Sequence, residues 1–357
     1  MTVIGARPQF VKAAPVSAAF AQHGIQELQV DTGQHYDPKL SSVIRADVGL
    51  RDPDVSLNVG SGTHANQTAQ MLLALEPVVM SFRPDAVVVF GDTNSTLAGA
   101  LVASKLHVPV AHVEAGLRSF NRRMPEEINR VMVDHISTWT FCTSVVATAQ
   151  LRCEGIVTGV HLVGDVMRDA TNRFAPVAAR SVDVGQFGVT PKNFAVATIH
   201  RAQNTDDRSR LSQILSLIAS WPQPVVLPVH PRLREALREN GLSLPSNVCQ
   251  SEPCSYIEML ALVQNATHVL TDSGGLQKEA FWLQTPCITL REETEWVETV
   301  ELGWNSLVGV DKAKFSNAAF ARRPDPVLLD VYGDGHAAAK IAQILKEDCK
   351  CAASTGS

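Results

Sequence analysis

The feature that most constrains this 357-residue chain is an alternation, repeated from end to end, of short apolar runs with stretches of helical periodicity. The run at residues 86–90, Ala-Val-Val-Val-Phe, is apolar on both faces, which is typical of a strand buried in the centre of a parallel sheet. Strands and helices that alternate in this way form parallel sheets covered by helices on both faces. The sequence therefore predicts an α/β protein.

The alternation falls into two series, separated by an irregular segment. In the first series we expect strands at 1–4, 28–31, 86–90, 108–112 and 138–142, and helices at 11–23, 65–81, 95–106 and 126–137. In the second we expect strands at 194–199, 224–229, 268–272 and 286–290, and helices at 208–221, 232–240, 255–266 and 276–283. Proline and glycine interrupt the residues between the two series, which is typical of a linker. We predict two doubly wound domains, 1–173 and 193–334, joined by a linker at 174–192 and followed by a C-terminal helix and flexible tail at 335–357.

Composition excludes several classes of protein. The net charge is -5 and the basic residues are scattered, so we expect no nucleic-acid partner. A membrane span needs about 18 consecutive apolar residues, and no such run occurs. The first residues lack the features of a signal peptide, and the seven cysteines form no C-x-x-C pair. We therefore expect a soluble cytoplasmic protein with reduced thiols and no metal site.

Ligands of open parallel sheets bind beyond the carboxyl ends of the strands, so the residues that follow each strand are the first candidates. Ser273, Gly274 and Gly275 join an expected strand to a helix, where backbone N–H groups and the Ser273 hydroxyl favour a phosphate. Glu279, further along that helix, is placed to accept hydrogen bonds from ribose. The alternative is a glycine-rich turn with an N-cap serine.

Two basic residues follow the first expected strand. Arg7 lies just past it, after Gly5 and Ala6, and Lys12 lies five residues further along. A guanidinium at this position is suited to a diphosphate, and a surface ion pair is an equal alternative.

Carboxylates and histidines supply the candidates for acid–base chemistry. Asp92 and Glu114 each follow an apolar strand, and Glu126 opens a helix beside a second glutamate. Grouped carboxylates raise some of their own pKa values, which suits proton transfer; the alternative for one of the helical pair is that it complements the helix dipole. His200 and His230 end two strands of the second domain, where catalysis and ordinary hydrogen bonding are equally open.

The segment at 60–65, Gly-Ser-Gly-Thr-His-Ala, matches the loose form of the dinucleotide-binding fingerprint. It does not follow the first strand, and no acidic residue ends the next strand at the distance that ribose binding requires. We therefore expect no nicotinamide cofactor.

Seven short motifs occur in a fixed order along the chain, at residues 5–8, 32–35, 91–93, 112–118, 125–130, 198–201 and 272–279. Together they resemble those of the non-hydrolysing UDP-N-acetylglucosamine 2-epimerases, over about residues 2–310. The resemblance implies a glycosyltransferase-B-like fold of two Rossmann-like domains with the active site in the cleft between them. It also implies a cytoplasmic homodimer, no cofactor, and a UDP-sugar substrate that serves surface polysaccharide synthesis.

The same resemblance implies a mechanism and a set of roles. The C2 proton is removed, UDP is expelled from C1 to give a bound glycal, and both return with C2 protonated on the opposite face. Acid–base roles fall on Asp92, Glu114 and Glu126, and His200 assists departure of the diphosphate. The implied UDP-binding residues are Arg7, Lys12, His230, Ser273, Gly274, Gly275 and Glu279.

Departures from the common bacterial pattern affect substrate and regulation. Trp296 stands where those members have an arginine for the nucleotide, and Arg291 is a candidate substitute. Other features resemble a branch that acts on UDP-2,3-diacetamido-2,3-dideoxyglucuronate. The extra carboxylate of that substrate requires a cation, for which the candidates are Arg122, Arg123 and Arg168.

Residues 36–37, Tyr-Asp, are unlike the corresponding residues of members regulated by a second substrate molecule. A hydrolysing 2-epimerase and a retaining glycosyltransferase remain the alternative enzymes. A non-catalytic protein that binds UDP-sugars is the last alternative.

Overall fold

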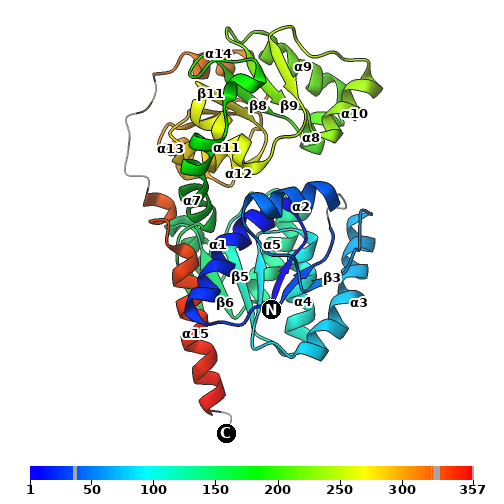
Figure 1. The fold of residues 1–357 in the computed structure, drawn as a ribbon, viewed down its shortest axis with the longest axis vertical. Coiled ribbons are helices and arrows are strands. Elements are labelled where there is room, and N and C mark those ends of the chain that lie inside the picture. Colours follow the sequence, from blue (N-terminus) through cyan, green and yellow to red (C-terminus); the bar gives the residue numbers. More distant parts are fainter. Residues whose placement is uncertain (35–37, 323, 325–329, 356–357) are drawn as a thin grey trace. The chain divides into compact units, whose positions relative to one another are not determined.

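The computed structural model describes residues 1–34, 38–322, 324 and 330–355. The chain divides into two compact units (Figure 1). Unit 1 comprises residues 1–172 and 329–357, and unit 2 comprises residues 173–328.

Unit 1 contains a seven-stranded sheet in the order β3-β2-β1-β4-β5-β6-β7, in which every pairing is parallel. Its strands are β1 (Thr2–Ile4), β2 (Gln29–Asp31), β3 (Val55–Ser56), β4 (Val87–Phe90), β5 (Val110–Ala115), β6 (Trp139–Cys142) and β7 (Val160–Leu162). Its helices are α1 (Arg7–His23), α2 (Pro38–Asp47), α3 (His64–Phe82), α4 (Asn94–Lys105), α5 (Pro125–Ile136), α6 (Val145–Cys153) and α15 (Ala337–Thr355), with the 3-10 turn η2 (Asp330–Tyr332).

Unit 2 contains a six-stranded sheet in the order β10-β9-β8-β11-β12-β13, again with parallel pairings only. Its strands are β8 (Ala195–Thr198), β9 (Val225–Pro228), β10 (Val248–Ser251), β11 (His268–Thr271), β12 (Cys287–Thr289) and β13 (Asn305–Leu307). Its helices are α8 (Ala202–Thr205), α9 (Arg208–Ala219), α10 (Pro231–Asn240), α11 (Tyr256–Asn265), α12 (Gly274–Trp282), α13 (Val297–Glu301) and α14 (Lys312–Ala319).

Both sheets follow the Rossmann strand order, so the predicted fold class of two doubly wound α/β domains is confirmed. In such a sheet the strand order reverses beside the first strand, and ligands bind beyond the carboxyl ends there. The reversal falls between β1 and β4 in unit 1 and between β8 and β11 in unit 2. A ligand is therefore expected beyond the carboxyl ends of the strands at these two points.

The segment predicted as a linker contains regular structure. Helix α7 (Val166–Ser181) extends through its first part, and the 3-10 turn η1 (Val184–Phe187) follows. The boundary between the two units falls within α7, after Asn172. The C-terminal helix α15 belongs to unit 1, where it packs beside α1 (Figure 1).

The strands at the reversal points are held by close helix packing. All four residues of β4 are buried, and helix α4 lies against them. A Cβ on Gly99 of α4 would lie 3.0 Å from the Val89 side chain and 3.2 Å from that of Val3, so glycine is needed for this approach. The close packing fixes the level at which β1 and β4 end. Among the described residues, no helix is long and apolar enough to cross a membrane.

Candidate active site

In unit 1, Asp92 and Glu114 lie at the carboxyl ends of neighbouring strands. Strands β4 and β5 pair in parallel up to Phe90 and Val113, and each carboxylate follows shortly after. Glu114 has a φ of +74°, at a point where the register of β5 shifts. A non-glycine residue in this conformation is costly, so the surrounding structure must hold it there. The fold thus brings together two of the predicted acid–base residues.

Lys12 of α1 forms an ion pair with Glu114, and both side chains are largely buried. Gly91 lies beside them: a Cβ at this position would be 3.2 Å from both Glu114 Oε2 and Lys12 Nζ. Gly91 also has a φ of +63°, which glycine adopts without strain. The predicted phosphate-binding lysine is therefore in contact with a predicted acid–base carboxylate.

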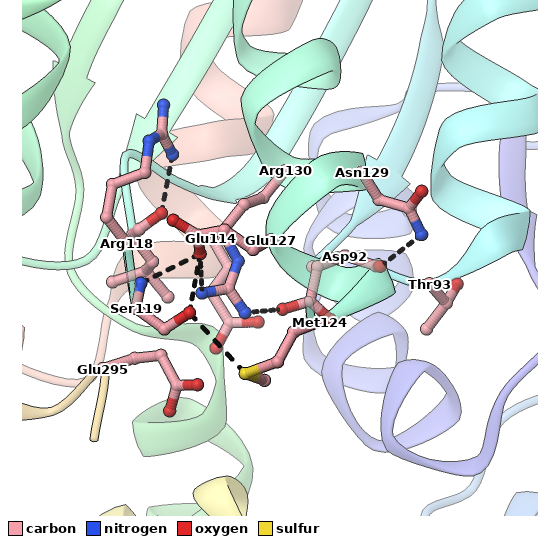
Figure 2. A network of polar contacts seen from close by, with 12 residues as sticks. Asp92, Thr93, Glu114, Arg118, Ser119, Met124, Glu127, Asn129, Arg130 and Glu295 are labelled. Carbon is pink, nitrogen blue, oxygen red and sulfur yellow. Dashed lines mark hydrogen bonds and ion pairs between the residues drawn. The ribbon is translucent and has the colours of Figure 1, made fainter. Parts of the chain in front are cut away.

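Asp92 has its own cation. Arg130 of α5 donates to the Asp92 carboxylate, and its other terminal nitrogen donates to Glu127 Oε2 over 3.0 Å (Figure 2). The Asn129 side chain donates to the Asp92 carbonyl oxygen over 2.9 Å. Helix α5 therefore holds both the side chain and the backbone of Asp92.

The two adjacent glutamates of α5 differ in their surroundings. Glu127 is buried and accepts hydrogen bonds of 2.9 Å from the backbone N–H groups of Ser119 and Phe120 and from the Ser119 hydroxyl. Glu126 is half-buried, and its side chain has no hydrogen bond or ion pair with any other described residue. Glu127 therefore fixes the loop before α5, while Glu126 is left open.

Arg7 is the first residue of α1, directly beyond β1, and is half-buried. The turn that leads to it is built tightly. Gln9 Oε1 accepts from the N–H groups of Gly5 and Ala6 over 2.9 and 3.0 Å, and a Cβ on Gly5 would overlap the Thr32 hydroxyl. The structure thus places Arg7 at the reversal point of the unit 1 sheet.

A buried charged network lies behind these strand ends. His112 Nδ1 is 2.7 Å from Asp134 Oδ1, and its Nε2 is 2.7 Å from the Gly91 carbonyl oxygen. Arg118 donates to Asp134 over 2.7 Å and also forms an ion pair with Glu154. Burial alone would raise the pKa of Asp134, but His112 and Arg118 lower it below its ordinary value. The network fixes the carbonyl that directly precedes Asp92.

In unit 2, His200 and Asp272 follow the paired ends of β8 and β11. Asp272 is fully buried, and its Oδ1 lies 3.2 Å from His200 Nδ1. The carboxylate also accepts from the backbone N–H of Arg201 and from Asn204, each over 3.0 Å. Burial opposes ionisation, yet the contacts with His200, Arg201 and Asn204 lower the pKa of Asp272 below its ordinary value.

His230 packs against His200. The two rings meet edge to face, with their centroids 5.6 Å apart. His230 is also the N-cap of α10, where its Nδ1 accepts from the backbone N–H of Arg232 over 3.2 Å. Both predicted histidines are thus brought together at one edge of the sheet.

The N-terminus of α12 lies at the same edge. Ser273 occupies the N-cap position, but its side chain does not cap the helix and has no partner among the described residues. A Cβ on Gly275 would have no atom within 4 Å, and one on Gly274 would lie 3.4 Å from Trp296 Nε1 and 3.8 Å from Arg201 Nη2. Glu295 Oε2 lies 3.8 Å from the same Gly274 Cβ position, so a carboxylate stands beside the guanidinium. The backbone N–H groups at the start of α12, the Ser273 hydroxyl and Arg201 are the groups at this edge that suit a phosphate.

Other residues near this helix are buried and already in contact. Glu279 is buried within α12, and Lys278 places its ammonium 3.6 Å from the centroid of the Trp296 ring. Arg291, the candidate nucleotide contact, is buried and pairs with Glu295 through two contacts of 3.1 and 3.2 Å. The structure thus binds Arg291 to a carboxylate, and Arg201 is the guanidinium beside Gly274.

Arg130, Asp134 and Asp272 are not among the site residues predicted from the sequence. Asp272 carried the same signal as Asp92, an acidic residue directly after an apolar strand. Arg130 carried an i, i+3 spacing from Glu127, which the structure shows as an ion pair. Asp134 carried no local signal, because its partners come from β5 and the residues after it. Of the motif at 32–35, residue 35 lies outside the described residues, as do residues 36 and 37, on which the prediction about regulation depends.

Comparison with known proteins decides the family. The family model described as UDP-N-acetylglucosamine 2-epimerase matches residues 18–346. The chain belongs to this family. A UDP-2,3-diacetamido-2,3-dideoxy-D-glucuronate 2-epimerase from Pseudomonas aeruginosa is 46% identical over 354 residues, covering 97% of this chain and 98% of the relative.

Two further matches, one in sequence and one in structure, come from Methanocaldococcus jannaschii. A UDP-N-acetylglucosamine 2-epimerase from Methanocaldococcus jannaschii is 43% identical over 328 residues, covering 88% of this chain and 90% of the relative. The crystal structure of a UDP-GlcNAc 2-epimerase from the same organism, in complex with UDP-GlcNAc and UDP, is similar with a TM-score of 0.91. It is 40% identical, over 97% of this chain and 99% of that one. The resemblance drawn from the seven motifs is therefore confirmed.

Proposed function

We propose that this chain inverts C2 of a UDP-2-acetamido sugar by eliminating UDP and adding it back. The observation that carries the proposal is the pair of carboxylates at the adjacent ends of β4 and β5, each with its own cation. Lys12 and Arg130 allow Glu114 and Asp92 to stand on neighbouring strands without mutual repulsion. Carboxylates held in this way suit the removal and return of a proton.

The proposed chemistry balances without any added redox partner. A carboxylate takes the C2 proton, the C1–O bond breaks with its electron pair going to the diphosphate, and a glycal forms. UDP then adds back to C1 while a second carboxylic acid protonates C2 on the other face. Asp92, Glu114 and Glu126 are the proposed acid–base groups, and Glu126 is the one without a partner in the described residues.

Because an unactivated C2–H is a weak acid, the departing diphosphate must be strongly stabilised. Unit 2 offers the groups for this at one edge of its sheet: the open N-terminus of α12, the Ser273 hydroxyl, Arg201 and His200. We propose that unit 2 binds UDP there, with His230 and Glu279 contributing, and that the proton transfers fall to the carboxylates of unit 1. Arg7 and Lys12 are the proposed cations of unit 1.

Two sugars are candidates. The UDP-GlcNAc/UDP-ManNAc pair is the first, and the diacetamido-glucuronate pair is the second. The second is favoured by Arg122 and Arg123, which are exposed and form no ion pair within the described ranges. Arg168, by contrast, is bound to the Gly333 carbonyl oxygen and to Asp330. If the substrate carries an extra carboxylate, Arg122 or Arg123 is therefore its proposed partner.

The test is proton NMR of the protein in D2O with each UDP-sugar in turn. We expect gluco and manno epimers to interconvert with deuterium entering at C2, and Asp92→Asn to abolish both processes. An Arg122→Ala, Arg123→Ala double variant should lose activity only if the uronate is the substrate. No exchange at C2 with any sugar would contradict the proposed function.

The two alternative enzymes would give different results in the same NMR experiment. A hydrolysing 2-epimerase would accumulate free UDP in step with free manno sugar. A retaining glycosyltransferase would turn over only after an acceptor is added. The cytoplasmic location, the homodimer and the independence from cofactors stay predictions.

A further inference from the structure

His200 and Asp272 lie just beyond the ends of two paired strands of unit 2, two residues after β8 and one residue after β11. Thr198 of β8 pairs with Thr271 of β11, so the two residues follow the strand ends at the reversal point of the sheet. The threonine hydroxyls are 2.5 Å apart, which closes the two strand ends on each other. The contact between imidazole and carboxylate is thus built on the rigid part of the unit.

The Asp272 carboxylate is fixed by several donors. Its Oδ2 accepts from the backbone N–H groups of His200 and Arg201 and from Asn204 Nδ2, all over 3.0 Å. Its Oδ1 lies 3.2 Å from His200 Nδ1. Because Oδ2 accepts from these N–H donors, the Asp272 carboxylate is held in one orientation, and its ionised form is favoured over the protonated one.

The His200 ring is held on one side only. Its side chain is 37% exposed, and its Nε2 has no hydrogen-bond partner within the described residues. The His230 ring packs edge-on against it, with the ring centroids 5.6 Å apart. Rotation of the imidazole away from Asp272 is therefore obstructed, while Nε2 stays open.

We propose that Asp272 is a positioning residue that holds a proton on Nδ1 of His200 and thereby presents Nε2 to the ligand. This inference rests on the proposed function, in which His200 assists departure of the diphosphate. With Nδ1–H directed at a carboxylate, a second proton on Nε2 gives a cationic ring whose charge Asp272 balances. That ring donates a charge-assisted hydrogen bond to the diphosphate oxygen as the C1–O bond breaks, which is stronger than a neutral one.

The Asp272→Asn variant tests this directly. Asparagine keeps an oxygen for Arg201 and Asn204, but it places an NH2 group where Oδ1 faced Nδ1. Nδ1 must then accept, so the proton moves to Nε2. We expect nitrogen-15 NMR of histidine-labelled protein to show His200 with its proton on Nδ1 in the wild type and on Nε2 in the variant. The kcat should fall about 10- to 100-fold with KM within about threefold.

Asn204→Ala is the matched control, because it removes a donor to the same carboxylate without touching the contact with Nδ1. It should leave the His200 tautomer unchanged and kcat within about threefold. A wild-type His200 with its proton on Nε2 would overturn the proposal even if Asp272→Asn does not fold. A fall in kcat with no change of tautomer in Asp272→Asn would overturn it too, because the role would then be structural only.

The tautomer measurement needs no turnover, so the two proposals fail separately. If no UDP-sugar exchanges at C2 but the tautomers change as expected, only the proposed function is contradicted. If C2 exchange is normal but the tautomers do not respond to Asp272, only the present inference is contradicted.

Discussion

His112 and Asp134 form a pair in unit 1, and His200 and Asp272 form a pair in unit 2. The two pairs differ in which ring nitrogens are in contact with the protein. In unit 1, His112 and Asp134 are both fully buried, and both ring nitrogens of His112 face acceptors. In unit 2, Asp272 is equally buried, but the His200 side chain is 37% exposed and only Nδ1 is engaged. A histidine–aspartate pair therefore has both ring nitrogens in contact with the protein in unit 1, and leaves Nε2 of its histidine open in unit 2.

The difference lies in what surrounds the pair. Arg118 adds a positive charge to Asp134, and the Gly91 carbonyl takes the second nitrogen of His112. Asp272 is contacted by the His200 ring, by backbone N–H groups and by the Asn204 amide, and no arginine donates to its carboxylate through its side chain in the described residues. A buried His–Asp pair with both nitrogens bound indicates stability, whereas one with an open nitrogen indicates chemistry.

The largest expected effect is on the free energy of unfolding when the buried pair of His112 and Asp134 is changed. Asp134→Asn leaves His112 and Arg118 without their carboxylate in a dry environment, so we expect it to lower the free energy of unfolding by about 3–5 kcal/mol. Urea unfolding of the variant measures this. A loss below about 1 kcal/mol would mean that the network is not essential to unit 1.

Changing the pair of His200 and Asp272 should affect kcat much more than the free energy of unfolding. His200→Gln should reduce kcat about 100-fold, within the range of an acid–base group, while the free energy of unfolding changes by less than about 0.5 kcal/mol. Steady-state kinetics and urea unfolding on the same preparation give both values. The matched variant is His112→Gln, which should chiefly destabilise. Equal effects of the two variants on stability would contradict the distinction between the pairs.

The two aspartates should also share a pH dependence. Their pKa values lie below the ordinary value in the folded chain, so the unfolded chain binds more protons at acid pH. Their contribution to stability is complete above about pH 5 and is lost as the pH falls through the folded pKa values. Urea midpoints measured from pH 6 to pH 3 should therefore fall, and fall less steeply in Asp134→Asn and Asp272→Asn.

The pKa of Asp169 is raised rather than lowered, so its effect on stability has the opposite pH dependence and serves as the control. Burial raises its pKa to about 6, although it accepts from the N–H groups of Ala337 and Ala338 at the start of α15. Because the folded chain binds the proton more tightly, its contribution to stability is lost as the pH rises through about 6. Asp169→Asn should therefore remove a decline in stability between about pH 4 and pH 6. A steeper decline would contradict this assignment.

The smallest expected effect is on the reactivity of two buried thiols, one in each unit. Cys142 in unit 1 and Cys287 in unit 2 are buried, and burial raises the pKa of each thiol to about 12. Exposed Cys153 should react with a thiol reagent at pH 8 at once, and the two buried thiols only when their unit opens. Asp134→Asn should speed labelling of Cys142 and leave that of Cys287 unchanged. Equal acceleration at both thiols would show that the units unfold together.

The accuracy of the sequence prediction differs between the centre and the edges of each sheet. The predicted strands correspond to β1, β2, β4, β5 and β6 in unit 1, and to β8, β9, β11 and β12 in unit 2. The missed strands, β3, β7, β10 and β13, are the outermost ones. An edge strand is covered on fewer sides, so short polar sequences such as Asn305–Leu307 suffice and leave no apolar run to detect.

The site shows a similar division. Residues directly after apolar strands were predictable, because topology alone brings such positions to one edge of a sheet. What the sequence could not provide was pairing: that Lys12 contacts Glu114, that Arg130 joins Asp92 to Glu127, and that Asp272 holds His200. Only the contact of Arg130 with Glu127 has a local i, i+3 spacing. The others join residues up to 102 positions apart, and no local pattern encodes them.

The central claim is that C2 inverts through loss and return of UDP. A single sample of UDP-GlcNAc, or of the diacetamido-glucuronate, with oxygen-18 in the C1–O–P bridge and dissolved in D2O, tests it most directly. The account predicts that deuterium enters C2 while oxygen-18 moves from the bridge to non-bridging positions of the β-phosphate. Deuterium at C2 with all the oxygen-18 still in the bridge would contradict it, because the C1–O bond would then never have broken.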